Sequence, residues 1–412
     1  MFLNEEENRK LAQVGPGTPG GELLRRYWQP IAGLHQVTEG SPTAFVRILG
    51  EDLVLFRDKS GNVGLLADHC AHRGASLLYG RVEERGIACA YHGWLYDTKG
   101  SCLETPAEPG DSKFHLTVKQ RAYPVEKYLG LYWTYMGPPP VPPIRRFDME
   151  GYPLQRITVM PHDASWIQAL ENNGLDATHI YILHQDTGAR QGTVIANTTR
   201  GRIDELASFD CEEVSCGVRY TMFGRDGYVE EDRIVFPNLL RRVNQIQIHT
   251  PIDDTHTNCY KLYFSREPIG RDGIRDEEPV DFYVQDAFEL KEGRGVYPDV
   301  RYRMNQLGYQ DIMAIETQGG IAPRDNWRLG TADRGIVLFE QMLLREIDRV
   351  RDGKDPVAVV RNPDDVIDTA YEFFRDRWHE RLTQVVPAGV QVFAREQGSR
   401  TASAHEAIAA RS

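Results

Sequence analysis

The pattern of hydrophobic and polar positions divides the chain into two parts. Between about residues 31 and 137, short apolar runs such as Ala44–Leu49 and Leu53–Phe56 alternate with turn residues. This alternation is typical of a small antiparallel β domain. Residues 138–143 are almost all proline and predict a stiff, extended connector. We therefore expect a domain boundary near residue 140.

The second part mixes helical and strand patterns. Apolar spacing predicts a helical stretch over about 164–184 and an amphipathic helix over 333–350. Strands are expected between about 193 and 265, followed by an acidic loop at 267–278. The chain is thus predicted to be α+β, with an N-terminal lead-in (1–30) packed on the larger domain, an all-β domain (31–140) and a larger mixed domain (141–412).

Two short motifs inside the β part carry the most specific chemical signal. Cys70-Ala71-His72 is followed after 16 residues by Cys89-Ala90-Tyr91-His92, so each motif supplies one cysteine and one histidine. Two thiolates on one iron and two imidazoles on the other hold an asymmetric 2Fe–2S cluster. Neutral imidazoles lower the negative charge on such a cluster and raise its potential. The spacing therefore predicts a one-electron carrier inside the β domain.

Zinc is the alternative metal for a mixed set of Cys and His ligands. Zinc modules more often keep like ligands together, as C-x2-4-C and H-x3-5-H pairs. Here the ligands interleave, and each motif continues into a glycine, in HRGA (residues 72–75) and YHGW (residues 91–94). Glycine permits backbone N–H groups to approach the cluster sulfurs. The pattern favours the iron–sulfur cluster.

Composition narrows the setting of this redox centre. The net charge of −12 argues against nucleic acid and against anionic membrane surfaces as partners. The acidic N-terminus lacks a basic, apolar signal pattern, and no apolar run approaches a membrane span. The other four cysteines have no framework spacing, which suits thiols in a reducing cytoplasm. They are Cys102, Cys211, Cys216 and Cys259.

A second metal site is suggested by His179 and His184. Histidines five apart lie about 140° apart on an ideal helix, so they converge only if the helix bends or breaks. Gly174 supplies a point of weakness nearby. Such a pair alone is usually a pair of ordinary surface or core histidines. A one-electron carrier needs an acceptor, however, and a ferrous ion held by two histidines and one carboxylate, with open positions for dioxygen, meets that need.

The carboxylate ligand cannot be chosen from spacing alone. Candidates are Asp311, Glu316 and Asp333. Asp311 lies in the otherwise apolar segment 310–318, where a buried carboxylate needs a partner. On these grounds Asp311 ranks only slightly above Glu316. Asp176, three residues before His179, is placed to hydrogen-bond that histidine, although an ordinary helix-face carboxylate is the simpler interpretation.

Together the motifs CAHRGA, CAYHGW, Asn173-x2-Asp176-x2-His179-x4-His184 and QDIMAIETQG resemble a Rieske non-haem iron oxygenase α subunit. The resemblance spans roughly residues 20–350 and is nearest to the phthalate dioxygenase and aryl O-demethylase branch. It implies a helix-grip catalytic domain with an antiparallel sheet. It also implies a Rieske 2Fe–2S cluster on Cys70, His72, Cys89 and His92, and one Fe(II) on His179, His184 and Asp311.

The resemblance carries further expectations for the assembly and the electron path. Asp176 would bridge His179 to the cluster ligand His92 of a neighbouring subunit, in a head-to-tail homotrimer whose stacking into a hexamer stays open. Asn173 matches a position near the iron. A separate reductase or ferredoxin would deliver electrons from NAD(P)H, because the chain has no dinucleotide fingerprint. Where the branch tends to have an acidic residue before Leu-Gly, this chain has Trp327-Arg328, a departure in the pocket chemistry.

The substrate is the least determined part. Gln247 or His249, or an arginine before them, could read a carboxylate or phenolate of an aromatic substrate, but a strand with one wet face explains the same alternation. The favoured function is monooxygenation with O2, such as O-demethylation of an aryl methyl ether. Cis-dihydroxylation of an aromatic acid is the alternative. A Rieske electron carrier with an inert second domain is the remoter one.

Overall fold

The computed structural model describes residues 3–147, 152–184, 206–225, 229–242, 244–264, 281–285, 288–291, 300–304, 307–367 and 369. Residues 1–370 form one compact unit, and the second unit (371–412) lies outside the described residues. The expected acidic loop at 267–278 and the expected strands at 193–205 also lie outside them.

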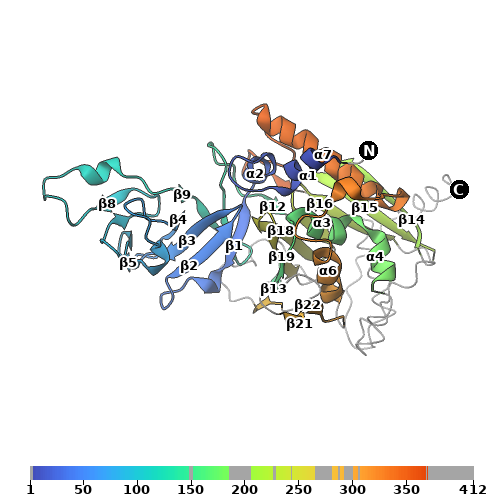
Figure 1. The fold of residues 1–412 in the computed structure, drawn as a ribbon, viewed down its shortest axis with the longest axis horizontal. Helices are drawn as coiled ribbons and strands as arrows, with labels where there is room; N and C mark the ends of the chain where they lie inside the picture. The colour runs from blue at the N-terminus through green and yellow to red at the C-terminus, as the bar shows by residue number, and fades with distance from the viewer. Residues whose placement is uncertain are drawn as a thin grey trace. The chain divides into compact units, whose positions relative to one another are not determined.

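The N-terminal part is built from three small sheets (Figure 1). One has the order β2-β3-β4-β9, the next β5-β6-β7-β8, and the third β1-β11-β10. The apolar run in β3 is buried on both faces, because Leu53 and Leu55 belong to one apolar cluster and Val54 and Phe56 to another. The strands are β1 (Gln29–Gly33), β2 (Thr43–Ile48), β3 (Glu51–Arg57), β4 (Val63–Ala67), β5 (Arg81–Glu83), β6 (Gly86–Ala88), β7 (Leu95–Tyr96), β8 (Cys102–Glu104), β9 (Ala122–Tyr123), β10 (Val125–Tyr128) and β11 (Leu131–Thr134).

The larger part is organised by an eight-stranded sheet in the order β14-β15-β16-β17-β18-β19-β13-β20. All neighbours pair antiparallel except β13 and β20, which are parallel, so the expected antiparallel sheet is confirmed and carries one parallel edge strand. Its strands are β13 (Leu154–His162), β14 (Leu206–Val214), β15 (Gly217–Gly224), β16 (Val229–Val235), β17 (Leu239–Arg242), β18 (Gln245–Asp253), β19 (His256–Phe264) and β20 (Asp281–Val284). Two short pairs complete the described strands: β12 (Arg146–Phe147) with β23 (Val366–Ile367), and β21 (Phe288–Lys291) with β22 (Val300–Tyr302).

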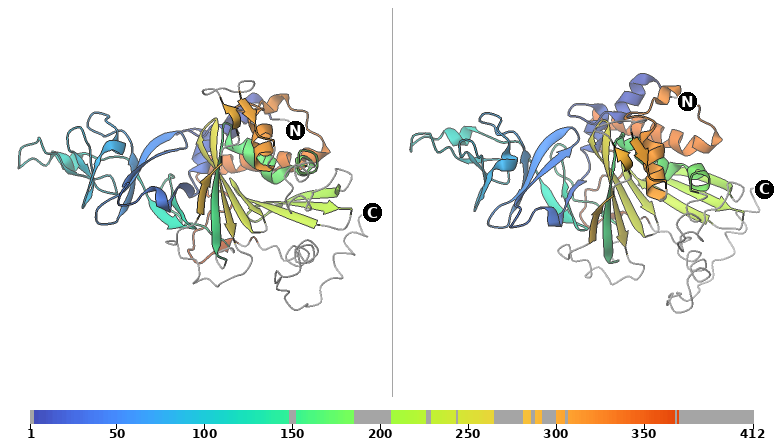
Figure 2. Two further views of the ribbon diagram at one scale, coloured as in Figure 1. Left: turned by 90° about the horizontal axis from the view of Figure 1, so that it is seen from below. Right: turned by 60° about the horizontal axis from the view of Figure 1, so that its bottom comes forward.

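Helices cover one face of this sheet (Figure 2). Helix α3 (Trp166–Leu175) contacts β16 to β19, α6 (Leu307–Glu316) contacts β13, and α7 (Arg334–Arg351) contacts β14. The N-terminal helices α1 (Glu5–Ala12) and α2 (Pro19–Leu24) pack on α7. The glycine- and proline-rich segment at 15–21 separates α1 from α2 and in part begins α2, with Pro19 in its first turn.

The two faces of the sheet have different neighbours because side chains alternate along each strand. Val159 and Tyr260 point toward the small sheet β1-β11-β10 and belong to the same apolar cluster as Trp133. Met160 and Cys259 point the other way and pack on Ile312 of α6. Any polar side chain in register with Met160 and Cys259 therefore lies between the sheet and its helices.

The structure has two helices where the sequence predicts one. The stretch predicted over 164–184 is interrupted at Asp176, which has extended backbone (φ −121°, ψ 100°) between α3 and α4 (Ala177–Ile182). Gly174, the expected point of weakness, lies within α3, where an added Cβ would come 3.1 Å from Leu240. Its smallness therefore serves close packing of α3 on β17, and the break comes two residues later.

The helix predicted over 333–350 is α7, one residue displaced at each end. None of the described helices is long and apolar enough to cross a membrane. The N-terminal β part and the large sheet are joined by backbone hydrogen bonds from Leu49 N to Pro251 O (3.0 Å) and from Gly50 N to Ile252 O (2.9 Å). The predicted domain limits at 30 and 140 stay predictions.

Candidate metal centres

The two cysteine–histidine motifs fold into loops of the same design. In the first, the Cys70 N–H donates to Ala75 O (2.9 Å) and the Gly74 N–H to Cys70 O (2.8 Å). In the second, Cys89 N–H donates to Trp94 O (2.9 Å) and Gly93 N–H to Cys89 O (2.8 Å). Both glycines have positive φ, 75° and 73°, which closes each turn without a Cβ penalty. The loops therefore present their ligand side chains as a matched pair.

The side chains of these loops form two groups, a pair of imidazoles and a pair of thiols. The imidazoles of His72 and His92 lie with ring centroids 4.6 Å apart, and His72 stacks on Trp94 at 4.3 Å. The thiols of Cys70 and Cys89 are both buried. Tyr96 Oη lies 3.2 Å from Cys70 Sγ, close enough for a hydrogen bond to that sulfur. This tyrosine was not singled out from the sequence.

These residues fit an iron–sulfur cluster. The Nδ1 atom of His72 is buried and has no hydrogen-bond partner among the described residues. A buried polar atom without a partner is costly, and a metal bond removes that cost. A cluster held by two thiolates and two imidazoles supplies one-electron storage at a raised potential.

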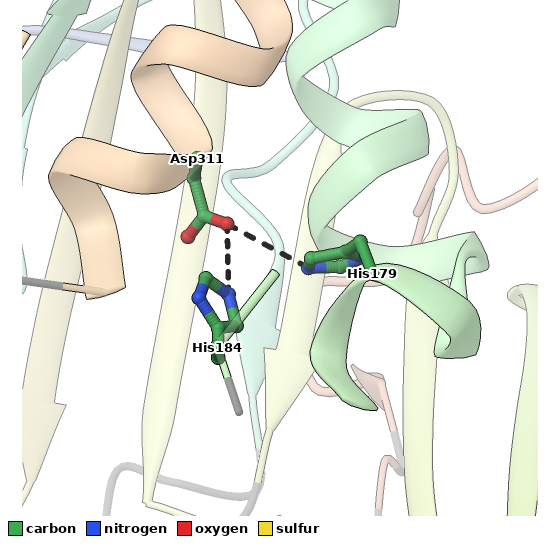
Figure 3. A group of neighbouring side chains, drawn as sticks. All are labelled: His179, His184 and Asp311. Carbon is green, nitrogen blue, oxygen red and sulfur yellow. Dashed lines mark ion pairs between the residues drawn. The ribbon is translucent and has the colours of Figure 1, made fainter. Parts of the chain in front are cut away.

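The second candidate centre brings together His179, His184 and Asp311 (Figure 3). One ligand atom from each lies within 4.8 Å of the others. Asp311 Oδ1 is 3.0 Å from His184 Nε2 and 3.6 Å from His179 Nε2, and each side chain is about one-tenth exposed. Two imidazole nitrogens and one carboxylate oxygen that lie this close together form a set suited to non-haem ferrous iron.

The charge of Asp311 suits a metal ligand. Burial alone would raise the pKa of this carboxyl, but the hydrogen bond from His184 and the two histidine charges outweigh burial and hold the pKa well below its usual range. A carboxylate must be ionised to bind a divalent ion. The buried residues therefore keep the oxygen ligand charged in a site that is otherwise poor in water.

The break at Asp176 explains how two histidines five residues apart can converge. Asp176 ends α3 and caps α4, with its Oδ1 accepting the backbone N–H groups of Thr178 (2.8 Å) and His179 (3.2 Å). Its Oδ2 lies 3.5 Å from His179 Nδ1. Burial opposes ionisation of Asp176, but its bonds and proximity to His179 lower its pKa overall. One carboxylate thus caps the helix and faces the far side of the imidazole.

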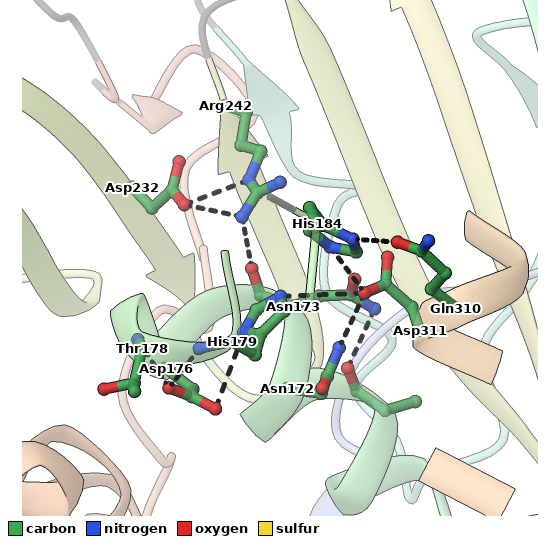
Figure 4. A network of polar contacts seen from close by, with 11 residues as sticks. Asn172, Asn173, Asp176, Thr178, His179, His184, Asp232, Arg242, Gln310 and Asp311 are labelled. Carbon is green, nitrogen blue, oxygen red and sulfur yellow. Dashed lines mark hydrogen bonds and ion pairs between the residues drawn. The ribbon is translucent and has the colours of Figure 1, made fainter. Parts of the chain in front are cut away.

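Two amide side chains that the sequence did not identify also contact the proposed iron ligands (Figure 4). Gln310 Oε1 accepts from His184 Nδ1 at 2.7 Å, and Asn172 Nδ2 lies 3.4 Å from Asp311 Oδ1. The expected asparagine, Asn173, instead donates to Ala169 O within α3 and accepts from the Arg242 guanidinium. No local sequence signal distinguishes Asn172 from Asn173, because the difference is set by which face of α3 meets α6.

The other candidate carboxylates have different surroundings. Glu316 accepts from Asp163 N (2.9 Å) and from Tyr302 Oη (2.8 Å). Asp333 accepts from Gly330 N (2.7 Å) near the start of α7. Asp311 is therefore the candidate that the structure brings to the two histidines. Arg328, at the departure from the family pattern, is exposed and donates to the carbonyl groups of Asn326 and Trp327.

The two suggested substrate residues are buried on the sheet face that α6 covers. Gln247 donates to Gln245 Oε1 at 2.6 Å, and His249 Nε2 lies 3.8 Å from Cys259 Sγ. Burial and the neighbouring His162 and Lys261 charges lower the pKa of His249, so its imidazole is neutral. Their role with substrate stays a prediction.

Comparison with known proteins adds the family. A Rieske [2Fe-2S] domain model matches residues 27–124. The chain is 34% identical to the 5,5'-dehydrodivanillate O-demethylase oxygenase subunit of Sphingobium sp. (strain NBRC 103272 / SYK-6), covering 88% of this chain and 84% of the relative. It is 34% identical to the phenoxybenzoate dioxygenase subunit alpha of Ectopseudomonas oleovorans (87% and 89%). It is also 35% identical to the tert-butanol monooxygenase / tert-amyl alcohol desaturase oxygenase subunit of Aquincola tertiaricarbonis (85% and 78%).

Solved structures agree at the level of the fold. The oxygenase in a fluorene-bound oxygenase–ferredoxin complex of carbazole 1,9a-dioxygenase superposes with a TM-score of 0.57 at 18% identity, over 83% of this chain and 96% of that one. The paired cysteine–histidine loops, the helix-covered sheet and relatives that match along most of their length lead to one conclusion. The chain belongs to the Rieske non-haem iron oxygenases, as a terminal oxygenase subunit that works with a Rieske 2Fe–2S cluster, mononuclear iron and dioxygen.

Proposed function

We propose that this oxygenase oxidises an aromatic substrate at an iron held by His179, His184 and Asp311, and that the reaction is O-demethylation of an aryl methyl ether. The observation that carries the iron site is the convergence of three ligand atoms, one from each side chain, within 4.8 Å. A ferrous ion at this site would supply the binding and activation of dioxygen. Three protein ligands would leave coordination positions of the ion for dioxygen.

O-demethylation is favoured by the relative that is named for it and matches most of both chains. In the overall reaction an aryl methyl ether, dioxygen, two electrons and two protons give a phenol, formaldehyde and water. One oxygen atom enters the methyl C–H bond, and the resulting hemiacetal loses formaldehyde. The phenoxybenzoate relative favours a second candidate, cis-dihydroxylation of an aromatic acid, which needs the same ligands with a different pose of the ring.

The electrons have to come from outside the chain. We assign their storage to the cluster on Cys70, Cys89, His72 and His92, and their delivery to a separate NAD(P)H-dependent reductase or ferredoxin. The oxygenase–ferredoxin complexes among the fold neighbours support a separate donor.

Transfer from cluster to iron is proposed to pass through Asp176 to His179, from His92 of the partner subunit in a head-to-tail homotrimer. Asp176 keeps 31% of its side chain exposed, and His92 is partly exposed, so both can be reached by a neighbouring subunit. Because the Asp176 carboxylate also caps α4, the proposed bridge is held at a fixed distance from its histidine.

Product analysis tests the proposal. The purified protein, a surrogate reductase and NADH would be incubated with methoxylated aromatic acids and their methoxy-free counterparts under labelled dioxygen. Phenol and an equal amount of formaldehyde are expected. A diol that carries both labelled oxygen atoms would replace demethylation by dihydroxylation. Reduction of the cluster without any oxygenated product would leave the hypothesis of a Rieske electron carrier without oxygenase activity.

A further inference from the structure

A group of buried polar side chains lies on the helix-covered face of the large sheet. Strand register places Lys261 of β19 opposite Gln247 of β18, and Cys259 opposite His249. Lys261 is two residues from Cys259 along the strand, so both point to the same face. Cys259 packs on Ile312 of α6, the residue after Asp311. Lys261 therefore lies on the same side of the sheet as the proposed iron ligands.

Lys261 is a buried lysine whose charge reaches the proposed iron site. Only 7% of the residue is exposed, and it makes no hydrogen bond or ion pair within the described ranges. Its charge acts on the site nonetheless, because it contributes to the lowered pKa of Asp311, of His162 and of His249. The N–H donors of Lys261 therefore lack an acceptor in the part of the chain that the structure describes, and a bound anion would supply one.

The two arginines suggested from the sequence as substrate readers are engaged elsewhere. Arg242 pairs with Asp232 at 2.9 Å and also donates to Asn173 O, so it fastens α3 to the sheet. Arg241 points to the opposite face and donates to Thr369 Oγ1 at 3.1 Å. Of Arg241, Arg242 and Lys261, Lys261 is therefore the residue on the helix-covered face that forms no ion pair with a described carboxylate.

The histidines beside Lys261 are neutral hydrogen-bonding groups. Burial, then the Lys261 charge, lowers the pKa of His162 to about 3. Both ring nitrogens of His162 and the Nδ1 of His249 are buried with no hydrogen-bond partner among the described residues. A divalent ion bound by two neutral imidazoles and one carboxylate would leave a further net positive charge nearby. This face therefore offers one ammonium and several polar atoms to an anionic ligand.

We propose that Lys261 is the specificity-determining residue that binds the carboxylate of an aromatic acid and so orients its ring toward His179, His184 and Asp311. The inference rests on the proposed function and names its substrate class. A carboxylate fits better than a phenol, because a phenol is uncharged at neutral pH and would leave the buried ammonium unpaired. Gln247, opposite Lys261 in the strand pair, is placed to add a neutral hydrogen bond to the same group.

Calorimetric binding to the iron-loaded protein under anaerobic conditions tests this without turnover. The probes are 3-methoxybenzoate and 3-phenoxybenzoate, each beside its neutral amide. Wild type is expected to prefer each acid, and Lys261→Met to lose roughly ten- to a hundredfold in affinity for the acids, with little change for the amides. Lys261→Arg should keep part of the preference. Lys354→Met removes an exposed lysine after α7 and serves as the matched control.

The outcomes are separable from those of the proposed function. Equal binding of acid and amide by wild type, no binding of either acid, or a preference that survives in Lys261→Met would overturn the assignment of Lys261. An acid preference that depends on Lys261, together with no demethylated product, would instead overturn O-demethylation and leave the carboxylate site standing. Iron content and the cluster absorbance of each variant report whether its fold is intact.

Discussion

Gln310 offers a direct test of how the proposed iron site is held together. Its Nε2 donates to Met304 O at 3.0 Å, which fixes the amide so that Oε1 faces His184 Nδ1 at 2.7 Å. Nδ1 then carries the proton donated to Gln310, so that Nε2, 3.0 Å from Asp311 Oδ1, is the nitrogen that would bind a metal. Gln310 is 3% exposed, so water does not readily replace this contact. The amide therefore sets both the tautomer and the direction of the iron-binding nitrogen.

Gln310→Leu keeps a similar volume but removes the acceptor. Loss of a group that orients a metal-bound histidine typically costs ten- to a hundredfold in metal affinity, which corresponds to about 1.4–2.7 kcal/mol. The assay is ferrous iron binding by competition with a chelator, with the cluster absorbance as an internal standard. Gln310→Glu, which retains an acceptor, should stay within about tenfold of wild type.

Gln318→Leu is the matched control, because Gln318 lies just beyond the same helix, is exposed, and donates its side-chain amide to Ala314 O. Its iron affinity should equal that of wild type. If Gln310→Leu bound iron as tightly as Gln318→Leu, the reasoning that Gln310 orients the ligand would be refuted.

Three further predictions follow from other contacts. Tyr96→Phe removes the hydrogen bond to Cys70 Sγ, and if that bond is worth about 1.4 kcal/mol the cluster potential should fall by about 60 mV in electrochemistry; an unchanged potential would exclude the bond. Asp176→Asn should slow oxidation of the reduced cluster in single-turnover stopped flow by roughly ten- to a hundredfold while iron content stays constant, whereas an unaltered rate would remove the bridge. Burial, then the charge of Glu171, raises the pKa of Glu340 to about 8 from 4.5, so the folded state binds the extra proton and stability should fall as pH rises between these values. Glu340→Gln should abolish this fall. If the melting temperatures of both proteins changed equally with pH between 5 and 8, the raised pKa of Glu340 would be contradicted.

The cluster motifs could be identified from sequence because their geometry is local. Each loop from cysteine to the residue after glycine closes on itself through two backbone hydrogen bonds, so the spacing within six residues carries the whole design. The β strands around them could likewise be predicted, because short apolar runs between turn residues mark strands in the order of residues itself. Tyr96 was missed, since its approach to Cys70 depends on how β7 passes the first loop.

The second centre depends on contacts that spacing does not encode. His184 and Gln310 are 126 residues apart, and only the packing of α6 beside α3 brings them together. The helix break was expected at Gly174, but the residue that ends α3 is Asp176, whose side chain stabilises the start of the next helix better than a continued turn. The carboxylate choice needed the resemblance, because Asp311 and Glu316 are both buried on the same helix.

Lys261 was visible in principle but was not singled out. A lysine among the mostly apolar residues of a predicted strand conflicts with its neighbours, and such conflicts are expected at functional positions. What the sequence could not supply was the register that sets Lys261 across from Gln247, or the engagement of Arg242 with Asp232.

The central claim is that His179, His184 and Asp311 hold a mononuclear iron, in addition to the iron of the Rieske cluster. Iron analysis of the purified protein and of Asp311→Ala, each normalised to cluster absorbance, tests it most directly. By ligand count, wild type should hold about three irons per chain and Asp311→Ala about two, with the cluster spectrum unchanged. An Asp311→Ala protein that keeps the third iron, or a wild type that binds only two after anaerobic loading with ferrous iron, would contradict the account.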